Sequence, residues 1–297
     1  MKPTSLISRH SISAYFILTY VLSWGLWLPI VLGYDGILRE ILFVAGIFGP
    51  AMAAILTTWL GGGSVRAWMV NIVLRCVRAR WWAFAMVIPV FLIGTASSAF
   101  AMLGNEIDLS LLPGRLGGYV PALVLTALIG GGRQEFGWRG FARPHLEKRY
   151  GPVSSTLILG VLWGLWHLPV VAADPEFHHG LDLAAFLPVA LMSLASVAGY
   201  AFILTWLFNR TGSVLLAMLL HAGFNTAYEL FVPLPPEAVA GTAYTTLSVT
   251  MTLTLAAVVL VLIAATRGRL GYGEDHSVDR SRNELSGEIN HSQSKSS

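Results

Sequence analysis

Long apolar runs follow one another along almost the whole chain, separated by short polar connections. Each run has about 20 residues, which is enough to cross about 30 Å of hydrocarbon as a helix. We therefore expect an all-α, polytopic membrane helix bundle with about eight transmembrane helices. The expected spans are 13–33, 39–60, 81–103, 118–141, 153–173, 184–208, 213–232 and 244–266.

The composition agrees with a membrane protein. Of the 297 residues, 55% are hydrophobic and 12% are charged, and the mean hydropathy is +0.66. A soluble domain carries about 25% charged residues. The composition therefore excludes an ordinary soluble enzyme, a nucleic-acid-binding module and a disordered scaffold. The single cysteine, Cys76, excludes an intrachain disulfide and a cysteine-ligated zinc site.

The basic residues predict the orientation of the spans. With the N-terminus in the cytoplasm, all of the 19 lysines and arginines except Arg39 and Arg115 fall on the cytoplasmic side, as the positive-inside rule requires. Both termini are then expected in the cytoplasm. We expect a short N-terminal segment over 1–12, a transmembrane domain over 13–269 and a disordered cytoplasmic tail over 270–297.

The connection over 61–80 interleaves apolar side chains with arginines. This pattern predicts a short helix at the cytoplasmic interface, with its arginines toward lipid phosphates. A basic loop that only sets the topology is the simpler alternative.

Ionisable residues inside spans are costly in lipid and are therefore candidates for function. The first cluster ends the fourth expected span, in the sequence GGGRQEFGWRGF over 130–141. Glu135 and Arg139 are four residues apart, so we expect them to share a helix face and to pair. Gln134 and Trp138 form the adjacent stripe. An ion pair at the membrane edge with an interfacial tryptophan is the alternative.

The second cluster lies in the fifth expected span, in LWGLWHLP over 162–169. Trp163 and His167 are predicted to share a helix face. Pro169 cannot donate to the carbonyl of Leu165, so the helix should open within one turn of the histidine. A histidine satisfied by a neighbouring helix is the alternative.

The third cluster lies in the seventh expected span, in LLHAGFNTAYE over 219–229. His221, Asn225 and Glu229 form a polar stripe that should face the bundle interior, because such a stripe is expensive in lipid. We expect Glu229, near the outer end, to be structural or interfacial. An interhelical hydrogen-bonding pair of His221 and Asn225 is the alternative to a functional site.

These side chains could converge in a protein-lined cavity that holds water. A glutamate can accept a proton from water, a histidine can position that water, and an asparagine–histidine pair can donate to a developing oxyanion. Such groups could hydrolyse an amide without a covalent intermediate. Neither a serine nucleophile elbow nor an HExxH motif is present.

The order QEFGWRG, WGLWH and HAGFN resembles the three motifs of the CPBP family, the CAAX protease and bacteriocin-processing (Abi) family, which are usually written EExxxR, FxxxH and HxxxN. The resemblance covers about 134–225 and implies an intramembrane endopeptidase whose active site opens toward the cytoplasm. The family includes the eukaryotic enzymes that trim prenylated CAAX proteins. The implied catalytic residues are Glu135, Arg139, His167, His221 and Asn225. The residues expected to line the cavity are Gln134, Trp138 and Trp163.

Two positions depart from the motifs. Trp163 stands where phenylalanine is usual, which keeps an aromatic wall. Gln134 stands where the family has the glutamate regarded as the water-activating base, and an amide has no useful basicity at pH 7. Either Glu135 replaces it from a position rotated by about 100° around the helix, or the protein is catalytically impaired and acts as a membrane peptide-binding, immunity or scaffold protein.

The remaining expectations concern cofactors, partners and location. We expect a metal-free mechanism without a cofactor; a zinc ion held by Glu135, His167 and His221 is the alternative. The expected partners are membrane lipid and a hydrophobic or lipidated, CAAX-like peptide substrate, with no nucleic acid. The expected location is the plasma (inner) membrane of a prokaryote. A transporter that uses these residues as a proton relay is disfavoured, because no inverted repeat is evident.

Overall fold

The computed structural model describes residues 10–73, 75–173, 183–232 and 242–273, which form helices and turns with no β-strand. The predicted all-α helix bundle is thus confirmed. Within these residues, six helical segments are long and apolar enough to cross a membrane, or up to eight if each of two bent helix pairs counts as one span. The protein is therefore an integral membrane protein. The six segments are α2 (Ser11–Val31), α6 (Ala79–Met102), α11 with α12 (Pro152–Trp166 and Leu168–Ala172), α13 (Leu183–Thr211), α14 (Val214–Phe231) and α15 (Thr242–Ala265).

Besides the fifth expected span, which is interrupted at His167, two of the expected spans are not continuous helices. In place of 39–60, α3 (Ile37–Ile47) and α4 (Gly49–Leu60) meet at 44°. Pro50 follows the break and supplies no N–H to continue the ladder of α3. In place of 118–141, α8 (Tyr119–Ile129) ends before the glycines, and α7 (Leu112–Leu116) precedes it. The segment Leu109–Leu116, which contains α7, is bent by 71° relative to the segment Tyr119–Tyr150, which begins with α8.

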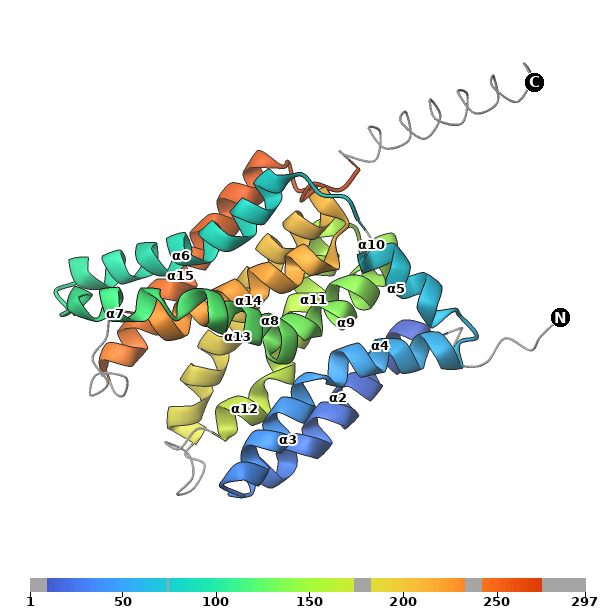
Figure 1. The fold of residues 1–297 in the computed structure, drawn as a ribbon, viewed down its shortest axis with the longest axis horizontal. Coiled ribbons are helices and arrows are strands. Elements are labelled where there is room, and N and C mark those ends of the chain that lie inside the picture. Colours follow the sequence, from blue (N-terminus) through green and yellow to red (C-terminus); the bar gives the residue numbers. More distant parts are fainter. Residues whose placement is uncertain (1–9, 74, 174–182, 233–241, 274–297) are drawn as a thin grey trace, which may run out of the picture.

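The bundle has two outer groups of helices with the central helices between them (Figure 1). Helices α6 and α15 pack against each other on one side, and α2 packs against α3 and α4 on the other. Between them, α11 packs against α13, and α14 contacts α6, α8 and α13. Polar residues carried by the central helices are therefore shielded from lipid on both sides.

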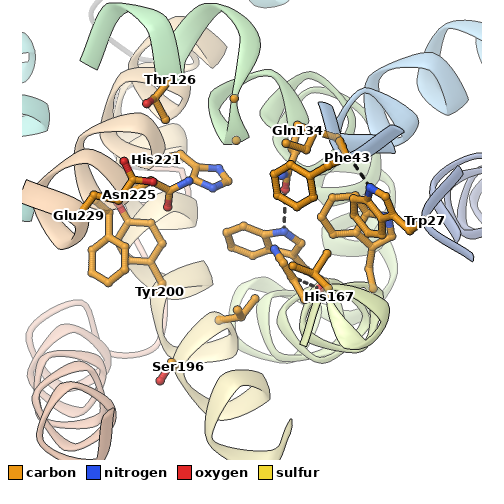
Figure 2. A pocket seen from close by; sticks show the side chains of 18 residues that line it. Trp27, Phe43, Thr126, Gln134, His167, Ser196, Tyr200, His221, Asn225 and Glu229 are labelled. Atoms are coloured by element: carbon orange, nitrogen blue, oxygen red, sulfur yellow. Dashed lines mark hydrogen bonds between the residues drawn. The ribbon is translucent and has the colours of Figure 1, made fainter. Parts of the chain in front are cut away.

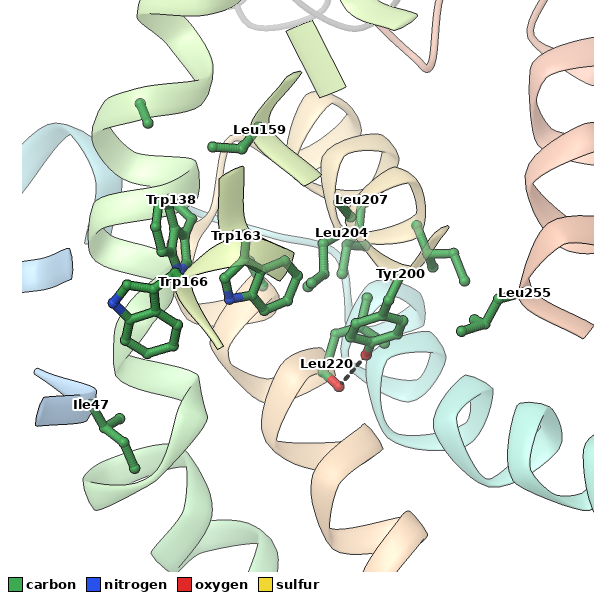
Figure 3. Close-up of a cluster of buried hydrophobic side chains, with 14 of the residues drawn as sticks. Ile47, Trp138, Leu159, Trp163, Trp166, Tyr200, Leu204, Leu207, Leu220 and Leu255 are labelled. Atoms are coloured by element: carbon green, nitrogen blue, oxygen red, sulfur yellow. Dashed lines mark hydrogen bonds between the residues drawn. The ribbon is translucent and has the colours of Figure 1, made fainter. Parts of the chain in front are cut away.

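The core of the central helices is built from tryptophans and leucines (Figure 3). Trp138, Trp163 and Trp166 are all buried. The hydroxyl of Tyr200 on α13 donates to the carbonyl of Leu220 on α14 over 2.7 Å. Gly160 lets α11 approach α13 closely, because a Cβ at this position would lie 2.8 Å from the Cα of Ala198.

A short helix, α5 (Val65–Val73), occupies the 61–80 connection as expected. It also packs against the bundle. Ile72 is buried, and the indole of Trp68 donates to the carbonyl of Gly140 over 2.9 Å. The helix is therefore fixed to the segment that carries the first motif and does not contact lipid alone.

The chain turns back after α15 in a segment that we call the C-terminal strap (Thr266–Tyr272). Leu270 in the strap is fully buried, and its carbonyl accepts a hydrogen bond from Asn209 Nδ2 over 2.8 Å. The strap includes 270–272, which we had expected to belong to a disordered tail. Most of that tail (274–297) and most of the expected N-terminal segment (1–9) lie outside the described residues.

Candidate active site

The first motif lies in a stretch where the helix changes its geometry three times. After Ile129 the chain runs through a 3₁₀ helix, η2 (Gly131–Gln134), one α-helical turn, α9 (Glu135–Gly137), and a π-helical stretch, η3 (Trp138–Ala142). Helix α10 (Arg143–Tyr150) follows. Short 3₁₀ and π segments often mark functional positions, because they re-aim side chains relative to a regular helix. Here they send two consecutive side chains, Gln134 and Glu135, to different partners.

Gln134 is held by two tryptophans. Its Oε1 accepts hydrogen bonds from Trp163 Nε1 over 3.0 Å and from Trp138 Nε1 over 3.3 Å. An indole N–H only donates, so this pair of contacts assigns the amide oxygen to the tryptophans. The amide nitrogen, a donor, is left for other contacts. Gln134 is buried and lines the cavity described below (Figure 2).

Glu135 forms the predicted ion pair with Arg139 and a further contact with His221. Arg139 Nη1 lies 3.1 Å from Oε1 and 3.0 Å from Oε2 of the carboxylate. His221 Nδ1 lies 2.7 Å from Oε1. Because a carboxylate accepts, the Nδ1–H of His221 donates. Glu135 and Arg139 are fully buried, and neither is among the residues that line the cavity. The carboxylate therefore lies behind His221. It does not contact the cavity itself, but it contacts the imidazole that does.

His167 lies where the fifth span is interrupted. Helix α11 ends at Trp166 and α12 begins at Leu168, so the predicted opening next to Pro169 is confirmed. His167 Nδ1 lies 2.9 Å from the carbonyl oxygen of Trp163 and donates to it. In the neutral ring, Nε2 of His167 then carries the lone pair. The same holds for His221, whose Nδ1–H is engaged by Glu135.

The stripe on α14 faces inward as expected. His221, Asn225 and Glu229 all line one cavity, and Figure 2 shows all three beside it. Gly131 on η2 lies against the first two. A Cβ at this position would meet Asn225 Nδ2 at 2.6 Å and His221 Nε2 at 2.7 Å. The glycine is therefore required for the close approach of the first and third motifs.

The cavity has a volume of about 360 Å³, and aromatic side chains form a large part of its wall (Figure 2). Trp163 contacts both histidines, with ring centroids 5.8 Å from His167 and 5.1 Å from His221. The other aromatic side chains that line the cavity are Trp27, Phe43, Trp166, Tyr200 and Phe224. Such a wall suits an apolar ligand, with few polar groups to orient it.

The site residues that we expected are thus separated into two layers. Gln134, Trp163, His167, His221 and Asn225 line the cavity. Glu135, Arg139 and Trp138 are buried behind it, Trp138 as a hydrogen-bond donor to Gln134. Sequence reasoning missed Trp27 and Phe43, which come from the first two apolar runs. The only sequence signal for these two residues is that they are aromatic. This signal is not specific, because many other aromatic residues of the chain do not line the cavity.

The expected zinc alternative finds little support in the donor set. Among the described residues, no group of three or more His, Cys, Asp or Glu side chains is placed to hold a metal ion. His167 and His221 both engage Nδ1 and keep Nε2 free, as zinc-ligating histidines do. Glu135, however, faces Nδ1 of His221 and Arg139 and does not line the cavity, so it does not complete a three-ligand zinc site with these two nitrogens.

The cavity lies away from the arginine-rich ends of the helices. Trp27 and Val170 are near the ends of α2 and α12 that precede 32–36 and 173–182, and Glu229 is near the end of α14 that precedes 232–241. The basic connections lie at the opposite ends of these spans. A site open to the cytoplasm and termini in the cytoplasm, both expected from the sequence, are therefore difficult to combine.

Known proteins resemble the part of the chain that carries the three motifs. Residues 116–227 match the family described as "Type II CAAX prenyl endopeptidase Rce1-like". A stretch of 113 residues is 28% identical to "CAAX prenyl protease 2" of Methanococcus maripaludis. The two matches support the resemblance to the CPBP family. The similar stretch makes up 38% of this chain and spans 41% of the relative's length.

The matched segment runs from the end of α7 to α14 and contains all three motifs. It therefore includes Gln134, Glu135, His167, His221 and Asn225. Helices α2 to α6 and α15 lie outside it. The part of the cavity wall that Trp27 and Phe43 form thus belongs to the region without a detected counterpart in the family model.

Proposed function

We propose that this protein is an intramembrane endopeptidase that hydrolyses peptide bonds of hydrophobic or lipidated peptides with an activated water. The observation that carries the proposal is the Glu135–His221 contact at the inner end of an aromatic cavity. The family supports it, since the matched relatives are named as prenyl endopeptidases and proteases. The cavity walls suit an apolar or lipidated peptide.

In this mechanism His221 is the base. With its Nδ1–H fixed on Glu135, its Nε2 accepts a proton from water while the water oxygen bonds to the scissile carbonyl carbon. The buried carboxylate stabilises the imidazolium that forms, as the aspartate does in a serine protease triad. Glu135 thus contributes through His221, which removes the need for a glutamate at position 134.

The amide groups stabilise the negative charge. We assign the Asn225 and Gln134 amide nitrogens as donors to the tetrahedral oxyanion, and His167 Nε2 as an acceptor that orients the water. His221 then returns its proton to the leaving nitrogen as the C–N bond breaks. Arg139 positions Glu135, and no step is assigned to a metal ion.

The proposal is tested by cleavage of a library of apolar and prenylated peptides by the purified protein in lipid nanodiscs, read by mass spectrometry. Wild type should cleave, and His221→Gln should lower the rate by about 10²–10⁴-fold, as for loss of a general base. His145→Gln is the matched control, because His145 is likewise held through Nδ1, in this case by the carbonyl of Phe141, but does not line the cavity. Equal losses in both variants, or no cleavage by any folded variant, would overturn the proposal.

A peptide-binding protein without catalysis is the second candidate. It is favoured by the amide at position 134, which two tryptophans hold in place. In the same assay, a wild type that binds but does not cleave, together with a Gln134→Glu variant that cleaves, would establish this candidate. Cleavage by wild type would exclude it.

We also propose that the protein lies in the plasma membrane of a prokaryote with both termini in the cytoplasm, as its arginine-rich connections indicate. The cavity would then lie in the outer half of the bilayer. Cys76 is exposed in an arginine-rich connection and tests this orientation. A membrane-impermeant maleimide should label it in inverted vesicles and not in spheroplasts. The opposite labelling would reverse the orientation.

A further inference from the structure

One carboxylate lines the described part of the cavity, and it lies at the end remote from the proposed base. Among the described residues that line the cavity, Glu229 is the sole carboxylate, and neither lysine nor arginine is present. Along α14 the stripe runs from buried His221 through half-buried Asn225 to exposed Glu229. Glu229 therefore marks the open end of the cavity on this helix, whereas His221 lies at its floor.

The Glu229 carboxylate forms no ion pair within the described part of the chain. Arg115 is close to the same end of α14, but it donates to the carbonyls of Leu230 and Val232 over 3.3 and 3.2 Å. This arginine caps the helix, and no lysine or arginine of the described residues pairs with the carboxylate. A ligand that enters the cavity thus passes this carboxylate beside apolar walls, where charges interact more strongly than in bulk water.

We propose that Glu229 selects substrates that carry a positive charge, a lysine, an arginine or a free α-amine, on one side of the scissile bond. Eight residues of α-helix separate Glu229 from His221, which corresponds to about 12 Å. An extended peptide rises about 3.3 Å per residue. The charge would therefore lie about two to four residues from the scissile bond, once the length of a basic side chain is included. The substrate class is an apolar peptide with one basic group at this spacing.

This inference rests on the proposed function, because the selected peptide is a substrate only if the protein is a peptidase. Its test therefore measures binding and cleavage separately. We would use apolar peptides that differ only in having Lys, Gln or Glu at each successive position. Binding to the protein in nanodiscs of neutral lipid is read by fluorescence anisotropy at low salt, and cleavage by mass spectrometry. The variants are Glu229→Gln and Glu229→Lys.

Wild type should bind the best-placed Lys peptide about tenfold more tightly than its Glu counterpart. Glu229→Gln should abolish the preference, and Glu229→Lys should reverse it. Glu106→Lys is the matched control, since Glu106 is an exposed carboxylate that follows α6 and does not line the cavity. This variant should keep the wild-type preference. Retained preference in Glu229→Lys, or loss of preference in Glu106→Lys as well, would overturn the inference.

The two proposals fail in different ways. If wild type binds with the expected charge preference but cleaves no peptide, the peptidase proposal fails and the role of Glu229 in selection stands. If wild type cleaves Lys, Gln and Glu peptides equally and binds them equally, the peptidase stands and the role of Glu229 is wrong.

Discussion

Two buried Arg–Glu pairs lie one after the other along the segment 135–147, and they differ in what surrounds them. In both, the partners are four residues apart and almost inaccessible to solvent. The first, Glu135–Arg139, is followed directly by the second, Arg143–Glu147. The order of the partners is reversed between the two pairs, but their chemistry and spacing are the same, so the comparison shows what the neighbours contribute.

The first pair joins the elements that build the cavity. Besides its contacts with Glu135, Arg139 donates to the carbonyl of Ala201 on α13 over 3.4 Å and lies 4.6 Å from the ring centre of Trp163 on α11. Glu135 adds His221 on α14. Three helices therefore meet at this pair, and one of its contacts is an imidazole that lines the cavity.

The second pair connects helix α13 and the C-terminal strap at the arginine-rich end of the bundle. Glu147 accepts from Asn209 on α13 over 3.3 Å, and Arg143 lies 5.3 Å from the ring centre of Phe208 and 5.9 Å from that of Tyr272 in the C-terminal strap. None of these groups lines the cavity. The difference indicates that burial of an ion pair alone does not identify a catalytic group, whereas its contact with a cavity-lining base does.

The largest effect should separate the two pairs by activity. Glu135→Gln removes the charge that stabilises protonated His221, so kcat should fall by about 10²–10⁴-fold. Glu147→Gln, the matched change in the second pair, should leave kcat almost unchanged. Both rates are measured on the same peptide in nanodiscs. Similar losses in the two variants would show that Glu135 supports the fold and does not act through His221.

The second pair should affect stability without affecting kcat. Glu147→Ala leaves the Arg143 guanidinium buried without its partner, and we expect the free energy of unfolding to fall by about 3–5 kcal/mol. Replacement of both residues, as Arg143→Met with Glu147→Leu, should restore most of this loss. Thermal unfolding in detergent measures both. A loss below about 1 kcal/mol in the single variant would mean that water reaches the pair.

A smaller effect is expected from the glycine between the motifs. The Cβ of Gly131→Ala would displace His221 and Asn225 from their positions, and we expect kcat to fall by on the order of tenfold to a hundredfold. Gly94→Ala on α6 is the control, because a Cβ there meets nothing within 4 Å. Unchanged kcat in Gly131→Ala would show that the two side chains can shift without loss of function.

The smallest effect should come from the longer of the two hydrogen bonds to Gln134. Trp138→Phe removes one indole donor from Oε1 but keeps the ring in the core, so we expect a loss of about 0.5–1.5 kcal/mol in stability. Trp163 would still hold the amide oxygen, and kcat should change little. Equilibrium unfolding in mixed micelles measures the first effect. A large fall in kcat would instead make the orientation of the amide critical.

The extent to which the sequence predicts this structure depends on how local each feature is. Apolar runs predict α2, α6 and α14 because length and hydropathy are properties of a single segment. The pairing of Glu135 with Arg139 and the interruption at His167 also follow from residues one turn apart. In contrast, the breaks at Phe48 and Gly130 were not predicted, since a proline or glycine inside an apolar run is compatible with a continuous transmembrane helix.

The sequence predicted which residues belong to the site, but not which of them line the cavity and which lie buried behind it. Helical spacing brings Gln134 and Glu135 to neighbouring faces of an ideal helix, and it cannot indicate that 3₁₀ and π segments separate them into a cavity wall and a buried support. The contact of Glu135 with His221 joins residues far apart in the chain. For the same reason the sequence assigned Glu229 to a structural or interfacial role, although it lines the cavity.

The C-terminal strap sets an order of events during biosynthesis. Leu270 and Tyr272 are made after all the transmembrane helices of the described residues, yet they contact Asn209 and Arg143 on helices inserted earlier. Because a chain is synthesised and inserted from its N-terminus, the contacts between α10 and the C-terminal strap can form only after α15 has entered the membrane. The arginine-rich end of the bundle would therefore lack these stabilising contacts until α15 has been inserted and the strap has packed against it.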